Sequence, residues 1–351
     1  MSIVRRVKQS MYDWPTPILR TFMYANKRMK SYEVDDAIAS FAGDALGENE
    51  KKTLKKQIYK DIYRFLITPS EFFLFDFPSL TDKEKANYVG DMERSILLGR
   101  IYNSNEAGKV FLSKTKTYEL FKPFMKRDLI KVSSEDDYAV FCEFAKAHDR
   151  FVLKPEIGEG GRGISIQESP GESERNGFFS CLLQVGPHVI EEMVEQSETM
   201  SSVHPESVNT VRFATYANGS GYSVVDCFFK MGKGSSIVDN GASGGIIAAI
   251  DPSTGVLTSS GRTETGDLFH NHPDTNVRIK GFQLPDWQGL LKLVGQLAQV
   301  LPEQRYVGWD LAHTTAHGWV MIEGNAGGQF LSQIPGRRGI GDAVAQTMGR
   351  A

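Results

Sequence analysis

The glycine-rich segment Gly158–Gly163 constrains the fold more than any other part of the chain. It matches the pattern G-x-G-x-x-G, which in dinucleotide-binding folds is followed directly by a helix. Here the glycines are followed by a strand-like run, Gly163–Gln167, and preceded by another, Phe151–Pro155. We therefore predict a glycine hairpin whose backbone N–H groups fold over phosphates, with Lys154 adding a point charge. The alternative is an ordinary glycine hairpin with a surface lysine.

The two parts of the chain differ in pattern. Residues 1 to about 105 are charged and aromatic, with apolar residues at helical spacing in Glu48–Ile67 and Asp82–Tyr102. From Phe151 onward short β-branched runs predominate, and one further helix is expected at about Asp286–Leu301. This order predicts an α+β protein with a mainly antiparallel sheet. The predicted strands are Phe151–Pro155, Gly163–Gln167, Val189–Val194, Thr210–Ala217, Tyr222–Met231, Gly245–Ile250, Tyr306–Thr314 and Gly318–Asn325.

The last two predicted strands form a hairpin that carries a set of hard oxygen ligands. Asp310 lies on the first strand, and Glu323 and Asn325 lie on the second. Alternation puts Glu323 and Asn325 on one face, where Asp310 can meet them across the hairpin. Two carboxylates and an amide oxygen suit Mg²⁺, which usually completes its shell with water and substrate phosphates. The hairpin therefore predicts a magnesium site, with a merely polar hairpin face as the alternative.

Composition limits the partners and the compartment. A net charge of −3 gives no reason to expect nucleic acid as a partner. The three cysteines, Cys142, Cys181 and Cys227, form neither a metal-ligand spacing nor a disulfide framework, which fits a reducing cytosol. No apolar stretch approaches the roughly 18 residues of a membrane span, and the N-terminus lacks a signal-peptide pattern. We expect a cytoplasmic protein without a transmembrane segment.

The first thirty residues form a basic and apolar segment. They hold seven Lys or Arg against one acid, with Trp14, Ile18 and Phe22 among the interleaved apolar residues. A basic amphipathic element of this kind can rest on an anionic membrane, or it can pack on its own protein. Both alternatives stay open from the sequence.

Taken together, the motifs from Phe111 to Gln329 resemble the ATP-grasp superfamily, and within it the sugar-transfer-associated ATP-grasp family, related to α-L-glutamate ligases. The most specific segment is Ser207–Arg212, with sequence Ser-Val-Asn-Thr-Val-Arg. It is followed in order by Val238-Asp239-Asn240, Gly244-Gly245, Ile250-Asp251, His272-Pro273 and the closing Gly308-Trp309-Asp310 and Glu323-Gly324-Asn325. The resemblance implies an ATP-grasp fold, in which two α+β subdomains clasp ATP, after a helix-rich N-terminal region. The implied boundaries are 1–110, 111–195 and 196–351.

The resemblance also implies roles for individual residues. Lys114 and Lys154 resemble the two ATP-grasp lysines, and Gly158, Gly160, Gly161, Arg162 and Gly163 resemble the phosphate loop. Glu191, Glu192, Met193 and Val194 resemble the linker that pairs with adenine, and Glu198 has the offset of a ribose-binding acid, with a solvated surface charge as the alternative. Arg212 is expected to face the γ-phosphate or an acyl-phosphate, with a structural salt bridge as the alternative. Lys230 occupies a place where a second basic residue is common, and Arg262 is a candidate for a substrate contact, although an exposed loop explains it almost as well.

The resemblance implies a reaction class. ATP-grasp ligases phosphorylate a carboxylate to an acyl-phosphate, which an amine then attacks. This chemistry needs positioning and charge neutralisation rather than a nucleophilic side chain, and the sequence offers no convincing Ser–His–Asp or Cys–His set. We expect a ligase that uses ATP and two Mg²⁺ ions, replaceable by Mn²⁺, on a carboxylate and an amine, with a carbohydrate or cell-envelope precursor suggested by the family name. The alternatives are a phosphotransferase acting on a hydroxyl and a non-catalytic nucleotide-binding module.

Overall fold

The computed structural model describes residues 34–43, 46–94, 105–158, 161–217 and 221–348. The chain divides into two compact units, one formed by residues 1–102 and 337–351 and the other by residues 103–336. Residues 337–351 thus group with the N-terminal unit, although the sequence suggested that they close the second ATP-grasp subdomain. The basic segment before residue 34 lies outside the described residues, and so does Gly160.

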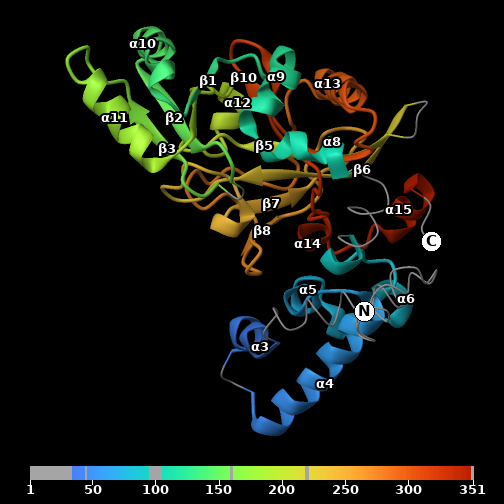
Figure 1. Cartoon of the computed structure of the whole chain (residues 1–351). Coiled ribbons are helices and arrows are strands. Elements are labelled where there is room, and N and C mark those ends of the chain that lie inside the picture. The colour runs from blue at the N-terminus through green and yellow to red at the C-terminus, as the bar shows by residue number, and fades with distance from the viewer. Residues whose placement is uncertain (1–33, 44–45, 95–104, 159–160, 218–220, 349–351) are drawn as a thin grey trace, which may run out of the picture. The chain divides into compact units, whose positions relative to one another are not determined.

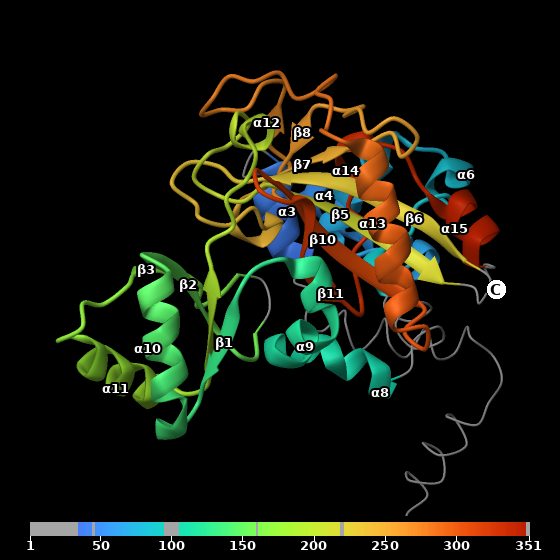
Figure 2. The same cartoon turned by 90° about the horizontal axis from the view of Figure 1, so that it is seen from above.

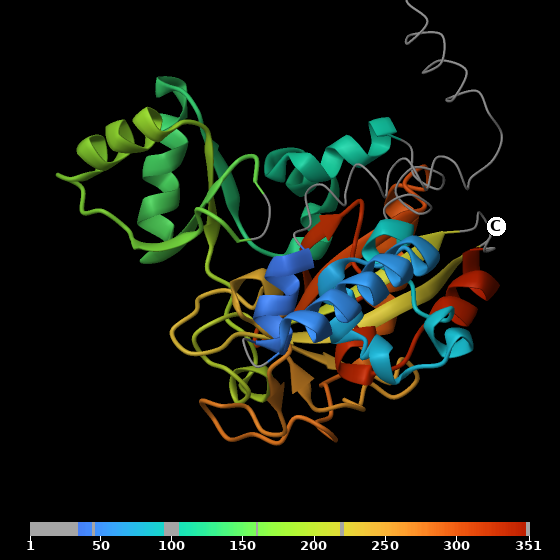
Figure 3. The ribbon, with the colours of Figure 1, turned by 90° about the horizontal axis from the view of Figure 1, so that it is seen from below.

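The N-terminal unit is helical, as the sequence predicted (Figures 1 and 3). Its elements are α3 (Val34–Ala42), α4 (Glu48–Phe65), α5 (Pro69–Leu74), η1 (Phe77–Ser79), α6 (Asp82–Lys85) and α15 (Gly341–Met348). Helix α5 begins with a capping box, in which the Thr68 hydroxyl accepts the Glu71 N–H and the Glu71 carboxylate accepts the Thr68 N–H. A cluster of aromatic side chains fills the core of this unit, namely Phe65, Phe72, Phe75, Phe77 and Tyr88.

One predicted helix in this unit is wrong in its extent. The pattern of Asp82–Tyr102 predicted a continuous helix, but α6 ends at Lys85 and the chain becomes helical again only at residues 91–94, beyond which residues 95–104 are not described. Gly90 lies within the interruption. A Cβ there would lie 2.4 Å from the carbonyl oxygen of Leu66, the C-cap of α4, so a residue with a side chain does not fit at this close approach.

The larger unit contains two antiparallel sheets. The four-stranded sheet has the order β1-β4-β2-β3, and the seven-stranded sheet has the order β11-β10-β5-β6-β7-β8-β9. The first sheet is formed by β1 (Leu129–Val132), β2 (Arg150–Pro155), β3 (Ser165–Glu168) and β4 (His188–Glu192). The second is formed by β5 (Thr210–Ala217), β6 (Tyr222–Met231), β7 (Ile246–Ala249), β8 (Gly261–Arg262), β9 (Leu268–Phe269), β10 (Tyr306–Thr314) and β11 (Gly318–Asn325).

Helices cover one face of each sheet. Helices α10 (Tyr138–Ala147) and α11 (Arg175–Val185) pack on the four-stranded sheet through a core that includes Phe141, Phe151 and Phe179 (Figure 2). Helices α9 (Lys114–Met125) and α13 (Trp287–Val300) pack on the seven-stranded sheet through a larger core. The short elements of this unit are α8 (Asn105–Gly108), η2 (Lys109–Leu112), η3 (Glu135–Asp137), α12 (Glu198–Ser201), η4 (Gly241–Ser243) and α14 (Gln333–Gly336).

This architecture is the α+β fold with antiparallel sheets that the sequence predicted. Among the described residues, no helix is long and apolar enough to cross a bilayer.

Candidate active site

The β10–β11 hairpin brings Asp310 opposite Glu323 only because β11 contains a bulge. Leu311 pairs with Met321, yet Asp310 pairs with Glu323, so Ile322 is an extra residue on β11. A regular ladder continuing from Leu311 would put Glu323 opposite Trp309, which is buried in the core. A bulge re-aims the side chains that follow it. Here it turns Glu323 to the face of Asp310.

Asn325 completes this group of oxygen ligands. Its Nδ2 donates to Glu323 Oε1 at 3.2 Å, so the amide and the carboxylate lie on the same face of β11. The Glu323 side chain is open to solvent, but the surrounding protein and the neighbouring Asp310 carboxylate raise its pKa. Two adjacent carboxylates with an amide oxygen form a donor set that fits Mg²⁺, and a divalent cation would relieve their repulsion.

Arg212 on β5 pairs with Asp310 in a bidentate geometry. Its Nε lies 2.5 Å from Asp310 Oδ1 and its Nη2 lies 2.7 Å from Asp310 Oδ2. Burial opposes both charges, but the pairing outweighs it, so the pKa of Asp310 is lowered and that of Arg212 is raised. The sequence left open a phosphate contact or a structural ion pair for Arg212, and the structure contains the ion pair. The remaining nitrogen, Nη1, has no hydrogen-bond partner among the described residues.

Lys230 on β6 lies between two carboxylates. Its Nζ is 3.2 Å from Asp310 Oδ1 and 3.4 Å from Asp239 Oδ1. Burial opposes the charge of the ammonium, but Asp239 and Asp310 together raise the pKa of Lys230. The other oxygen of Asp239 accepts the backbone N–H of Thr210 at 2.9 Å, which holds this carboxylate against β5. Lys230 is therefore a cation fixed beside Asp310.

The four-stranded sheet contributes a second charged group. Lys154 Nζ donates to Glu191 Oε2 at 2.9 Å, and Arg127 Nε donates to the same oxygen at 3.0 Å. Burial alone would raise the pKa of Glu191, but the two cations lower it to about 2. Lys114, the first residue of α9, donates from Nζ to the carbonyl oxygen of Gly158 at 3.2 Å. Desolvation lowers the pKa of Lys114, opposed by the nearby Glu323.

A cavity of about 490 Å³ connects these groups. This volume lies in the range of about 300–1,000 Å³ that is usual for small-molecule sites. Lys154 and Gly161 line it on one side, and Lys230, Asp310 and Glu323 line it on the other. The predicted linker Glu191, Glu192, Met193 and Val194 lines it too, with the apolar side chains of Val152, Ile164, Ile166, Val208, Ile237, Val238 and Ile322.

Several predicted site residues are not among those that line this cavity, namely Lys114, Gly158, Arg162, Gly163, Glu198, Arg212, Arg262 and Asn325. Glu198 is exposed at the start of α12, whereas Glu195 and Glu206 are the acids at that end of the cavity. Arg262 lies on the short strand β8, and its Nη1 donates to the carbonyl oxygen of Gly266 at 3.1 Å. The sequence left a substrate contact and an exposed loop as alternatives for Arg262, and in the structure this residue is half-buried on a short strand. A ribose contact for Glu198 stays a prediction.

The glycine loop leads into β3 rather than into a helix, as expected. Gly161 and Gly163 both have φ of +73°, a conformation that favours glycine, and Gly161 lies beside Val238 on the opposite side of the cavity. Arg162, between these glycines, is exposed. Gly158 is tied to Lys114 through its carbonyl oxygen. The described part of the loop thus reaches the cavity through Gly161.

We expect Gly161→Ala to weaken nucleotide binding. An L-residue at this φ costs roughly 1–2 kcal/mol, which corresponds to about a tenfold loss of affinity if the loop must keep this conformation around bound phosphates. Titration calorimetry with ADP and Mg²⁺ measures the change. Gly177→Ala, in helix α11 with no atom within 4 Å of the added Cβ, is the matched control and should bind like the wild type. Unchanged affinity in Gly161→Ala would remove the loop from the nucleotide site.

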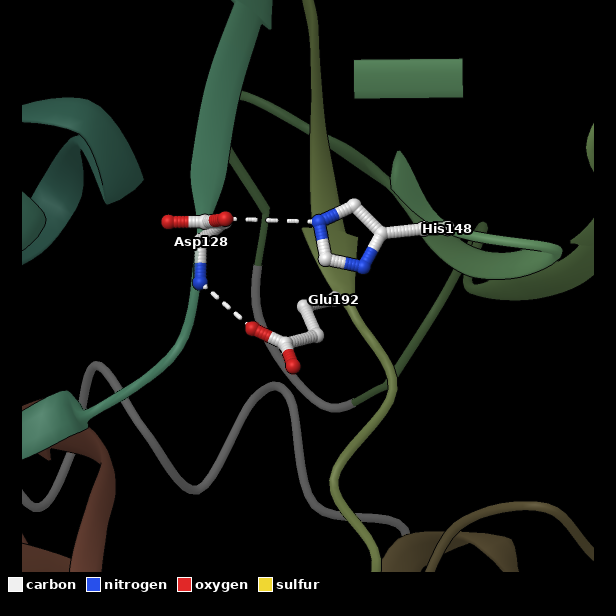
Figure 4. A group of neighbouring side chains, drawn as sticks. All are labelled: Asp128, His148 and Glu192. Carbon is white, nitrogen blue, oxygen red and sulfur yellow. Dashed lines mark hydrogen bonds and ion pairs between the residues drawn. The ribbon is translucent and has the colours of Figure 1, made fainter. Parts of the chain in front are cut away.

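Glu192 takes part in a second group of polar side chains, beside the linker. One of its carboxylate oxygens accepts the Asp128 N–H at 2.9 Å, and His148 Nε2 lies 3.3 Å from Asp128 Oδ2 (Figure 4). These residue types bind divalent metals, and their ligand atoms lie within 4.8 Å of one another. The hydrogen bonds account for the grouping without an ion, because they join the end of β4 to the start of β1. The side chain of Glu192 therefore stabilises the linker that carries Met193 and Val194.

Two polar residues that organise the site were not given a role from the sequence. Arg127 is buried at the start of β1, and its hydrogen bonds reach Glu191 and β11. Asn209 is fully buried, and its Nδ2 donates to Gln196 Oε1 at 3.0 Å and to the His204 carbonyl at 2.8 Å. Asn209 stood within the most specific family segment, so its position was a usable signal. Arg127 offered no such signal, because its partners Glu191, Met321 and Ile322 are distant in sequence.

Comparison with known proteins gives a match over most of the chain. The family model described as sugar-transfer associated ATP-grasp matches residues 93–348. A comparison with curated proteins found no match.

Among solved structures, similar folds include three ligases or synthetases. The ATP-grasp ligase PsnB, solved with minimal precursor, Mg and ADP, has 14% identity and a TM-score of 0.40, over 70% of this chain and 62% of that chain. The D-cycloserine synthetase DcsG has 15% identity and a TM-score of 0.39, over 68% of this chain and 70% of that chain. N5-carboxyaminoimidazole synthetase from Staphylococcus aureus, solved with ADP, has 9% identity and a TM-score of 0.44, over 76% of this chain and 59% of that chain. This chain therefore spans less than two thirds of PsnB and of the S. aureus synthetase.

Proposed function

Since the chain belongs to the sugar-transfer-associated ATP-grasp family, we propose that it binds ATP with Mg²⁺ and joins a carboxylate to an amine through an acyl-phosphate. The observation that carries this proposal is the convergence of opposite charges at one end of the cavity. Asp310 and Glu323 supply hard oxygen ligands, and Arg212 and Lys230 supply fixed positive charge beside them. Phosphoryl transfer requires this combination of positioning and charge neutralisation.

The nucleotide occupies the cavity between the two sheets. The adenine lies among the apolar residues of the cavity, against the backbone of Met193 and Val194. Lys154, held by Glu191, reaches the phosphates, and the glycine loop covers them. Lys114 stands at the same end, where the charge of Glu323 acts on it.

Glu323 and Asn325, with Asp310, hold the metal ions. The proposal includes two Mg²⁺ ions, which Mn²⁺ can replace, because oxygen donors suit both metals. When bound, the ions neutralise charge on the phosphates as it develops during transfer. Asp310 is engaged with Arg212 through both oxygens, so Glu323 and Asn325 are the ligands with more uncommitted lone pairs.

Arg212 and Lys230 act on the transferred group. Arg212 Nη1 is available to donate to an anionic oxygen, and Lys230 holds a second positive charge 3.2 Å from Asp310. The carboxylate substrate attacks the γ-phosphorus and ADP leaves. The amine then attacks the acyl carbon and phosphate leaves, which balances the reaction as ATP, carboxylate and amine giving ADP, phosphate and amide. We propose a carbohydrate or cell-envelope precursor as the carboxylate, following the family description.

Trapping with hydroxylamine tests this reaction class. The purified protein is incubated with ATP, Mg²⁺, hydroxylamine and a panel of amino acids and sugar acids, and the products are analysed by mass spectrometry. An acyl-phosphate is a mixed anhydride, so ADP, phosphate and a hydroxamate should form with the true carboxylate. A stable phosphorylated product without hydroxamate would show a phosphotransferase instead, and AMP with pyrophosphate would show a different activation chemistry.

A further inference from the structure

The bulge in β11 leaves backbone carbonyls that need partners. At Ile322 the ladder with β10 is interrupted, because Asp310 pairs with Glu323 and Leu311 with Met321. Arg127 supplies the partners from outside the sheet: its Nη1 donates to the Met321 carbonyl at 2.7 Å and its Nη2 to the Ile322 carbonyl at 3.0 Å. A buried carbonyl without a partner would cost about 1–3 kcal/mol, so these two bonds stabilise the bulged conformation.

The same guanidinium also binds the carboxylate that holds Lys154. Arg127 Nε donates to Glu191 Oε2 at 3.0 Å, and the Arg127 side chain is only 4% exposed. One buried side chain therefore connects the charged group of the four-stranded sheet to the strand that carries Glu323. The planar fork of arginine can make these three contacts at once, whereas an ammonium is a compact point charge.

We propose that Arg127 is a positioning residue for the metal site. By holding the two carbonyls at the bulge, it keeps Glu323 and Asn325 turned toward Asp310 and keeps this group in register with Lys154. The buried side chain of Arg127 borders the cavity, and in this proposal it acts through Glu323 and Asn325 rather than by binding the nucleotide or the metal. The inference rests on the proposed function, because it assigns to Glu323 and Asn325 the role of metal ligands.

The two functions of Arg127 can be separated by substitution. In Arg127→Lys the ion pair with Glu191 can form. The two hydrogen bonds from the guanidinium to the Met321 and Ile322 carbonyls are lost. Substitutions in such outer-shell partners typically cost about 10- to 100-fold in metal affinity. We therefore expect the ADP complex of Arg127→Lys to bind Mn²⁺ about 10- to 100-fold more weakly than that of the wild type. Its affinity for ADP without metal should stay within about threefold.

Electron paramagnetic resonance with Mn²⁺ and calorimetry with ADP provide the two readouts, neither of which depends on turnover. Arg150→Lys is the matched control, since Arg150 pairs with Glu168 at the exposed end of β2. Equal Mn²⁺ affinity in Arg127→Lys and the wild type would overturn the inference. A loss of metal-free ADP affinity as large as the loss of Mn²⁺ affinity would overturn it too, because it would indicate a general collapse of the site.

A second pair of variants covers the case in which Arg127→Lys does not fold. Removing a buried charge without its partner costs about 3–5 kcal/mol, so Arg127→Met is combined with Glu191→Gln. We expect the double variant to bind Mn²⁺ about tenfold more weakly than Glu191→Gln alone. The single variant Glu191→Gln keeps Arg127 and its hydrogen bonds to the Met321 and Ile322 carbonyls. Equal affinities in this pair would also overturn the inference. If the ADP complex of the wild type binds no Mn²⁺, the proposed metal site itself fails and Arg127 loses this role with it.

Discussion

The Glu323→Gln protein is expected to fold like the wild type and to turn over ATP about a thousandfold more slowly, because the charge stabilisation that metal ions supply is worth several kcal/mol. The fold should survive because the Glu323 side chain is open to solvent and lies beside a like charge on Asp310. Glutamine keeps the shape of the side chain and removes that repulsion. ADP release measures turnover, and thermal unfolding reports the fold.

The control for Glu323→Gln is Glu168→Gln, which changes an exposed carboxylate at the far end of the four-stranded sheet. This control should keep the wild-type rate. Glu323 would be excluded as a metal ligand if its glutamine variant turned over ATP as fast as the wild type.

The second large effect is expected for Arg212→Ala. This change removes the bidentate partner of Asp310 and the Nη1 donor that we assign to the transferred group. Turnover should fall by about two to three orders of magnitude, as for other fixed donors to developing negative charge. Stability should also fall, by up to about 3–5 kcal/mol, because Asp310 becomes a buried carboxylate whose ion-pair partner among the described residues is Lys230.

Two measurements separate these consequences of Arg212→Ala. The turnover number should fall far more than the affinity for ADP, because the adenine end of the cavity is formed by other residues. Arg212→Lys restores a positive charge but not the bidentate hydrogen bonding of the guanidinium to Asp310. It should therefore recover part of the stability and little of the turnover rate. A turnover number near the wild-type value in Arg212→Ala would contradict a role in charge neutralisation.

The sequence was a good guide where local pattern decides the structure. Strands β5, β6, β10 and β11 begin and end where the alternation of β-branched and aromatic residues predicted. These elements are set by side-chain period, which a single sequence displays directly.

The arrangement of the metal ligands could not be derived from period alone. Simple alternation in the hairpin would put Glu323 opposite Trp309, and only the extra residue at Ile322 turns it toward Asp310. The stabilisation of this bulge comes from Arg127, which lies 194 residues before Met321. Contacts at such a separation leave no periodic signal. The same reason explains why Asp82–Tyr102 was predicted as one helix, since the packing of Gly90 against Leu66 is a tertiary contact.

The most direct test of the account is the linkage between Mg²⁺ and ADP binding, measured by titration calorimetry. In the wild type, Mg²⁺ should tighten ADP binding by about tenfold or more, equivalent to at least 1.4 kcal/mol, because Glu323 and Asn325 hold the metal against the phosphates. In Glu323→Gln this gain should fall to less than about threefold, while metal-free ADP affinity persists. A wild-type protein that binds no ADP, or that binds it equally with and without Mg²⁺, would contradict the assignment of this cavity as a metal–nucleotide site.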